Sequence, residues 1–266
     1  MRLTMPTTFA HFSFGNEVLR KVSPELENII SSHRDLFNIG LHGPDILFYF
    51  KALSSNPVKK QGHTIHSKDA KSFLLNAKSI INNKQEQNAE IAYISGFICH
   101  FMLDSQCHPY VRQIEKEGIS HSEIETEFDR LLMEESGLDP LSYIPINHIE
   151  PKPAYAALIA QFYDGISPNE ILRALKSMRF NLAMLVAPKA PKRALITTAL
   201  RLSGNYEAMV GLLMKKEASE ECLRSSKHLR TLYLKAIETT AHLLDDFVKN
   251  LSNSEPIDRR FERNFG

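Results

Sequence analysis

The sequence lacks three features that would assign it to a common class of protein. It has no run of about eighteen or more apolar residues, so a membrane-spanning helix is not expected. Its 32 Lys and Arg residues nearly balance 31 Asp and Glu residues, and the net charge of +1 disfavours a nucleic-acid-binding protein, which usually has a strongly basic face. Its 3 cysteines form an odd count without the spacing of a disulfide framework, which favours a reducing compartment.

The chain also lacks an obvious targeting segment. Its first residues, MRLTMPTTFAHFSFG, contain no continuous apolar stretch and no small-residue cleavage site, so no secretory signal peptide is visible. We therefore expect a cytoplasmic protein, and leave open secretion without a signal peptide. The length of 266 residues suits one large domain or two small ones. A Pro-rich stretch at 140–153 fits either a domain boundary or a loop within one domain. We favour a single domain that spans residues 1–266.

Strand-like alternation is almost absent, whereas helical periodicity dominates. It predicts helices at 16–22, from Pro24 (capped by Ser23) towards 37, at about 69–82, at 86–106 and at 120–135, with further helices completing the fold over 154–251. Pro109 is expected to end the fourth of these near His108. The prediction is an all-α fold, a single multi-helix bundle.

One segment looks different from the rest. Residues 40–66 carry glycines and prolines at Gly40, Gly43, Pro44, Pro57 and Gly62, so we expect mostly a long loop. Loops of that length inside a compact domain tend to be functional.

The histidines are concentrated in the first half of the chain. Of 11 histidines, all but His148, His228 and His242 lie before residue 122. His100 and Asp104 are four residues apart in the apolar segment GFICHFMLDSQCHPY, which places them on one face of a buried helix. Imidazole and carboxylate are ligands of zinc, and a buried Asp needs a cation or strong hydrogen bonds. A hydrogen-bonded His–Asp pair is the alternative.

A second His–carboxylate pair follows. His121 and Glu125 are also four residues apart on a predicted helix, and His108 lies about 12 Å beyond His100 along its axis, within reach of a second ion. Taken alone, Glu125 reads as a surface carboxylate and His121 as a helix-start residue. Two such pairs close together favour a site for several metal ions. Cys107 is a possible soft ligand, but an inert cysteine at a helix end fits better.

The order of these residues resembles the zinc-dependent phospholipase C family, of which bacterial phosphatidylcholine-hydrolysing phospholipase C and alpha-toxin are typical. The resemblance covers roughly 5–130. His-x3-Asp falls on His100 and Asp104, the lone His on His108, and His-x3-Glu on His121 and Glu125. Asp45 in GLHGPDILFY matches a loop Asp, and His11 matches the N-terminal His. The remaining ligand comes from GHTIHSKDA, as His66 or its rival His63.

The resemblance implies a shared zinc centre. One ion would bind Asp45, His66, His100 and Asp104, a second would bind His108, His121 and Glu125, and Asp104 would bridge towards a third ion near His11. Asp45 would also be the catalytic base. Family enzymes use the amino group of an N-terminal Trp as a further ligand, but this chain has no Trp. The expectation is therefore two or three Zn²⁺ ions.

The predicted function is zinc-dependent hydrolysis of a phosphodiester, phospholipase C-like, with a phospholipid or another phosphodiester as substrate. The alternatives are a zinc phosphodiesterase or nuclease acting on nucleotides, and a non-enzymatic helical scaffold with structural metals. Related helical nucleases share a similar three-metal site, although no nucleic-acid partner is favoured. The stretch FNLAMLVAPKAPKRALITTALRL mixes apolar and basic residues. It fits peripheral membrane contact, or two core helices joined by a basic turn. The oligomeric state is left open.

Overall fold

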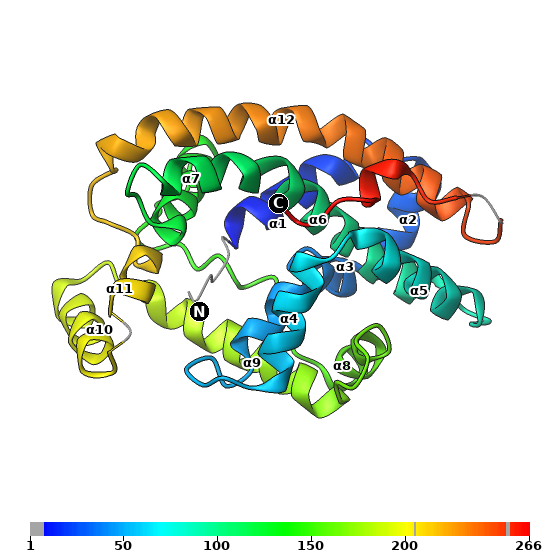
Figure 1. The fold of residues 1–266 in the computed structure, drawn as a ribbon, viewed down its shortest axis with the longest axis horizontal. Coiled ribbons are helices and arrows are strands. Elements are labelled where there is room, and N and C mark those ends of the chain that lie inside the picture. Colours follow the sequence, from blue (N-terminus) through cyan, green and yellow to red (C-terminus); the bar gives the residue numbers. More distant parts are fainter. Residues whose placement is uncertain (1–7, 205, 254–255) are drawn as a thin grey trace.

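A computed structural model of the chain describes residues 8–204, 206–253 and 256–266 (Figure 1). It confirms the all-α prediction, because the described residues form α-helices and short 3₁₀ helices and no strand. In chain order the elements are α1 (Phe9–Leu19), α2 (Pro24–Ser32), α3 (Arg34–Gly40), η1 (Gly43–Tyr49), α4 (Pro57–Ser67), α5 (Ala70–Asn82), α6 (Asn88–Glu115), α7 (His121–Glu135), α8 (Pro153–Ala160), α9 (Pro168–Leu185), α10 (Ala190–Leu202), α11 (Tyr206–Met209), η2 (Val210–Leu212), α12 (Glu220–Lys249) and η3 (Arg259–Phe261).

The centre of the fold is α6, which is buried along most of its length. Helices α1, α2, α3, α7 and α12 pack against it, and α12 runs along one edge of the view in Figure 1. The buried hydrophobic residues form a cluster that extends from Phe9 to Phe265. Whether 1–266 is one domain, as the sequence suggests, stays a prediction.

Two glycines allow α3 and α6 to cross closely. A Cβ atom on Gly40 would lie 2.1 Å from the carbonyl oxygen of Tyr93, and one on Gly96 would lie 2.2 Å from that of Phe37. Backbone atoms cannot give way as a flexible side chain can, so neither position accepts a larger residue. The crossing fixes where α3 ends and therefore where the next segment, which includes Asp45, begins.

The prediction that 40–66 is mostly loop is wrong. The segment contains η1 and most of α4. Pro57 occupies the first turn of α4, where a missing N–H costs nothing, and the Asn56 side chain caps that helix by accepting from the N–H of Lys59. Gly62 lies within α4, and a Cβ there would approach the Phe48 ring to 2.8 Å. Residues that usually signal a loop here start a helix and permit close packing.

Two helix boundaries also differ from prediction. Helix α1 begins at Phe9, well before residue 16, and α6 continues past Pro109 to Glu115. A proline within a helix removes one backbone hydrogen bond. Val111 and Ile114, which follow Pro109, are buried, and their burial offsets that loss.

Helices in the described part of the chain do not combine the length and apolar character needed to cross a bilayer.

Candidate metal centre

Three candidate ligands come from successive turns of α6. His100, Asp104 and His108 are spaced by four residues, so their side chains share one face of the helix. His100 is fully buried and Asp104 is 3% exposed. His108 lies nearer the surface. This row of side chains forms one wall of the site.

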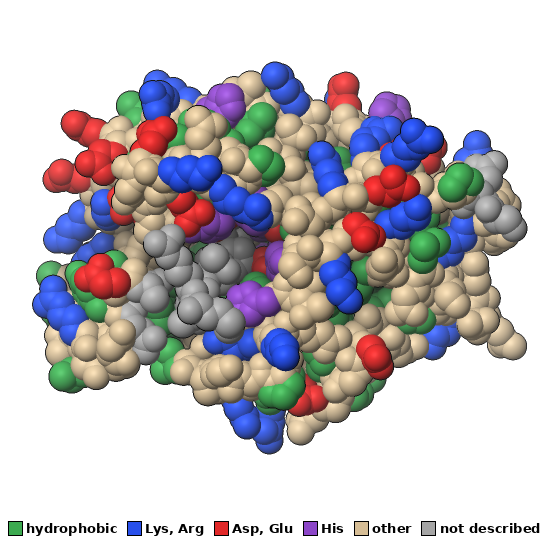
Figure 2. All heavy atoms as spheres, viewed as in Figure 1, with side chains coloured by type: hydrophobic (Ala, Val, Ile, Leu, Met, Phe, Trp, Pro, Cys, Tyr) green, Lys and Arg blue, Asp and Glu red, His purple; other side chains and the backbone are tan. Residues whose placement is uncertain are grey.

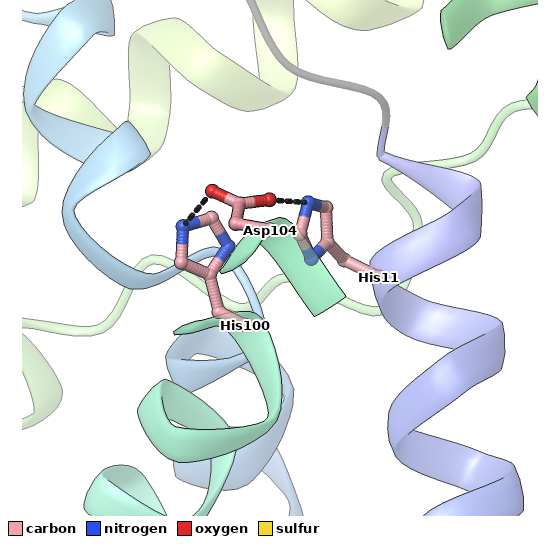
Figure 3. A group of neighbouring side chains, drawn as sticks. All are labelled: His11, His100 and Asp104. Carbon is pink, nitrogen blue, oxygen red and sulfur yellow. Dashed lines mark ion pairs between the residues drawn. The ribbon is translucent and has the colours of Figure 1, made fainter. Parts of the chain in front are cut away.

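Asp104 lies at the middle of the cluster. Its Oδ1 is 3.2 Å from Nε2 of His11, which is carried by α1, and 3.6 Å from Nε2 of His108. Its Oδ2 is 3.2 Å from Nε2 of His100 and 4.0 Å from Nε2 of His66. Figure 3 shows the carboxylate between the rings of His11 and His100, which stack with centroids 4.4 Å apart. Both oxygens therefore face imidazole nitrogens.

Asp45 reaches the cluster from the first turn of η1. Its Oδ1 is 2.9 Å from Nε2 of His66, at the end of α4, and its Oδ2 is 3.6 Å from Nε2 of His100. Gly43 makes room for this arrangement: its φ of +46° suits glycine, and a Cβ atom would lie 2.3 Å from the His100 ring. The hydroxyl of Tyr163 donates to the Gly43 carbonyl at 3.2 Å and holds the turn in place.

Helix α7 supplies the remaining pair. Oε1 of Glu125 is 3.2 Å from Nε2 of both His121 and His108. Ser120 caps α7 by accepting from the N–H of Glu123, so the helix begins where the sequence predicts. The His–carboxylate pair of α7 thus meets the last of the three side chains from α6.

The ligand atoms gather into three groups, two of which share a residue. Within each group the atoms lie within 4.8 Å of one another, and the groups are His11, His100 and Asp104; Asp45, His66 and His100; and His108, His121 and Glu125. His100 belongs to two groups, and Asp104 lies beside His108 of the third. Buried oxygens of Asp45, Asp104 and Glu125 accept no hydrogen bond from the described residues. Buried carboxylate oxygens without donors are costly unless a cation satisfies them, so this donor set fits clustered zinc ions.

The groups border a cavity of about 360 Å³. Phe48, His63, Ser67 and Arg112 line it beside the ligands, together with residues 264–266. Histidine side chains are visible in a hollow of the face shown in Figure 2. A small substrate can therefore reach the candidate ligands from outside.

A comparison with known families gives the family of this chain. The model of the family described as "Zinc dependent phospholipase C" matches residues 10–175. The chain belongs to the zinc-dependent phospholipase C family. No curated protein and no solved structure gives a significant match.

The region matched to the zinc-dependent phospholipase C family contains every residue of the three ligand groups and ends within α9. The predicted residues His11, Asp45, His66, His100, Asp104, His108, His121 and Glu125 are brought together. His63 is not: its ring packs on Phe48 with centroids 4.6 Å apart, and it joins none of the ligand groups found in the described residues. The assignment of these residues as zinc ligands stays a prediction.

Backbone carbonyls fix the orientation of two histidines. Because a carbonyl only accepts, Nδ1 of His66 donates to Gly62 at 2.7 Å, and Nδ1 of His108 donates to Phe265 at 2.9 Å. In the neutral ring, which is the form that binds metal, Nε2 carries no proton and faces the site. Metal-binding histidines typically use the second ring nitrogen in this way.

The sequence analysis missed the contribution of the C-terminal segment. The ring of Phe265, 1% exposed, lies 4.8 Å from that of His66 and 5.8 Å from that of His100. The backbone N–H of Phe265 also donates to the carbonyl of His66 at 3.4 Å. Phe261 and Phe265 are four residues apart, and that short apolar pair was the only local signal that this segment packs inward.

Charges within the cluster keep its carboxylates ionised. Burial would raise the pKa of Glu125, but His121 and His108 outweigh it and lower the pKa to about 2. Burial would likewise raise the pKa of Asp104, yet the charges of His100 and His108 hold it well below its usual value. Burial would lower the pKa of His121, and Glu125 and Glu115 instead raise it to about 9. Without a metal, the cluster therefore holds together as ion pairs.

Cys107, offered by the sequence as a possible soft ligand, and the histidine His42 lie apart from the ligand groups. Cys107 is buried, and burial raises the pKa of its thiol, which therefore stays protonated and a poor ligand. His42 forms a separate pair with His148, with their Nε2 atoms 2.8 Å apart. Burial lowers the pKa of both rings, so this pair is neutral.

Proposed function

We propose that this protein is a phospholipase C-like phosphodiester hydrolase. It would use water to cleave the ester bond between phosphate and the diacylglycerol of a phospholipid, giving diacylglycerol and a phosphorylated head group. Membership of the family supports a zinc-dependent enzyme of this kind. The observation that carries the proposal is the junction of three ligand groups through His100 and Asp104 beside one cavity.

The charge of the ligand set suits a phosphodiester. The groups contain three carboxylates, Asp45, Asp104 and Glu125, and the imidazoles are neutral when they bind metal. The ligands then carry −3, so two divalent ions leave a charge of +1 and three leave +3. When bound, clustered zinc ions hold phosphoryl oxygens, lower the pKa of a water molecule and stabilise the charge that develops during in-line attack.

Individual residues have distinct tasks in this proposal. Asp45 would be a metal ligand through Oδ1 and the general base through Oδ2, which would take the proton of the attacking water. Its Oδ2 accepts no hydrogen bond from the described residues. Asp104, with an oxygen towards each of two ligand groups, would keep the metals close together.

Arg112 would bind the substrate. It is the one Lys or Arg among the described residues that line the cavity, and it lies one turn of α6 beyond His108. Its guanidinium has no ion pair or hydrogen bond with the described residues. A free guanidinium at this position suits a phosphoryl oxygen or an anionic head group.

The test combines metal analysis with turnover. Protein purified without chelators should contain two or three zinc ions, and should hydrolyse a chromogenic phosphorylcholine ester and phospholipid in mixed micelles. Chelation and Asp104→Asn should each abolish turnover, whereas Asp164→Asn, at an exposed position, should leave it unchanged.

Other results would refute the proposal. Bound zinc with no turnover of any phosphodiester would indicate a scaffold with structural metals. Preferential hydrolysis of dinucleotides would indicate a nucleotide phosphodiesterase. The cytoplasmic location expected from the sequence stays a prediction.

A further inference from the structure

Charge is distributed unevenly along this nearly neutral chain. Residues 171–206 contain no Asp or Glu, yet they carry seven cations: Arg173, Lys176, Arg179, Lys189, Lys192, Arg193 and Arg201. The whole chain has a net charge of only +1. This segment covers most of α9 and all of α10, so these two helices carry cations and almost no acidic residues of their own.

The same segment exposes large apolar side chains. The described residues include eight such side chains, and four of them lie on α9 and α10: Phe180 (66% exposed), Met184 (42%), Leu195 (68%) and Leu202 (86%). On α9, the exposed residues Arg173, Lys176, Phe180 and Met184 recur at spacings of three or four and form one row. A row that is basic at one end and apolar at the other is unusual for a solvated surface.

Helix α10 is not a core helix. None of its residues is buried, and Leu195 and Leu202, seven residues apart, share one outer face. The sequence left open whether 180–202 forms two core helices joined by a basic turn or a peripheral membrane contact, and α10, without a buried residue, does not fit a core helix. In Figure 2, hydrophobic and basic side chains lie at the edge of the molecule where Figure 1 places α10.

Two of the seven cations have other partners: Arg179 pairs with Glu150, and Arg201 lies over the ring of Tyr206. The other five divide into two sets. Lys192 donates to the carbonyl of Val186 at 2.7 Å and Arg193 to that of Met214, so both anchor α10 to its neighbours. Arg173, Lys176 and Lys189 are exposed and have no hydrogen bond or ion pair with the described residues. These three cations are available to an external anion.

We propose that α9 and α10 together form a docking surface for an anionic phospholipid bilayer, here called the α9–α10 surface. Exposed apolar residues would enter the interface between head groups and acyl chains, while the free cations attract anionic head groups. A second copy of the same surface would set like charges against each other, and a nucleic acid would leave the apolar row exposed. Helix α9 packs on η1, which carries Asp45, and it does so with the side opposite to its exposed row. The lipid nature of the partner rests on the proposed function.

Sedimentation with lipid vesicles tests this surface. Full-length protein should bind vesicles of phosphatidylcholine mixed with phosphatidylserine more tightly than vesicles of phosphatidylcholine alone. The double substitution Leu195→Ser and Leu202→Ser should weaken binding about tenfold or more, because serine does not bury apolar surface in the bilayer as leucine does. Lys176→Gln with Lys189→Gln should weaken it about fivefold per charge at low salt.

Helix α12, at the opposite edge of Figure 1, provides matched controls. Leu223 and Leu234 are each 51% exposed, and Lys227 and Lys235 are exposed. The same substitutions there should leave vesicle binding unchanged.

All variants should keep their turnover of a water-soluble phosphorylcholine ester, which reads the metal site without a membrane. Three results would overturn the proposal of a docking surface. The α9–α10 and α12 variants could have equal effects, the protein could bind both kinds of vesicle equally well, or the variants of α10 could alter only self-association or DNA binding. If the wild-type protein does not hydrolyse the ester at all, the proposed function is overturned instead.

Discussion

Truncation of Phe265 separates the support of the metal site from simple packing. The ring is 1% exposed and lies within 6.0 Å, centroid to centroid, of Phe97, Phe101, His66 and His100. Removing a phenyl ring from such a position costs about 3–5 kcal/mol of the free energy of unfolding. The metal site adds a second effect, because the ring of Phe265 orients His66 and His100, whereas its backbone carbonyl, which binds His108, is kept in Phe265→Ala. Loss of such support typically lowers metal affinity about 10–100-fold.

Phe261 is the matched control for this substitution. It lies in the same C-terminal segment, is also 1% exposed and packs on Phe101 at 5.8 Å, but it has no ring contact with a candidate ligand. Phe261→Ala should therefore lose a similar free energy of unfolding and keep its zinc affinity.

Two measurements distinguish the effects. Denaturant unfolding of chelator-treated protein should show similar destabilisation in Phe265→Ala and Phe261→Ala. Competition with a chromophoric chelator should show weaker zinc binding in Phe265→Ala alone. If the two variants bind zinc equally well, or if Phe261→Ala loses as much affinity, the C-terminal segment has no specific role in the site.

Three further predictions concern the substrate, the histidine pair and the helix crossing. In steady-state assays, Arg112→Gln should raise KM for an anionic phosphodiester more than it lowers kcat. A fall in kcat with an unchanged KM would contradict its role in binding. Burial and the charge of Arg34 lower the pKa of His148 to about 3, so the unfolded state takes up a proton below about pH 6.5 while the folded state does not. Stability of chelator-treated protein should fall as the pH drops from about 6.5 towards 3, and His148→Gln should flatten that slope by up to about 1.4 kcal/mol per pH unit in denaturant titrations. Gly96→Ala should destabilise the protein by about 1–3 kcal/mol or more in the same titrations, because its Cβ would meet the Phe37 carbonyl; an unchanged midpoint would contradict the close crossing.

Local spacing explains what the sequence revealed about the site. His100 and Asp104, and His121 and Glu125, are each separated by four residues, and a helix places such pairs on one face whatever the rest of the fold does. The cap at Ser120 is equally local. These features could be read directly, and the structure adds that the two pairs meet through His108.

Features that depend on distant contacts could not be read in this way. Gly62 suggested a loop, but it lies within α4, where the absence of a side chain allows close packing on Phe48 of η1. Pro109 suggested a helix end, yet burial beyond it extends α6. Phe265 and His66 are nearly two hundred positions apart in sequence, and no spacing rule links them. Tertiary packing overrode local preference in each case.

The family match covers one part of the chain. The match ends at residue 175, and the candidate ligands all lie before that position. Phe265, which holds three of the histidines, and almost all of the α9–α10 surface lie after it. A ligand set tolerates little change, since each side chain must meet a shared ion, whereas an outer helix or a covering segment can change without moving the ligands. We therefore infer that the matched part supplies the candidate ligands, and that the part after residue 175 supplies the cover of the metal site through Phe265 and most of the proposed docking surface.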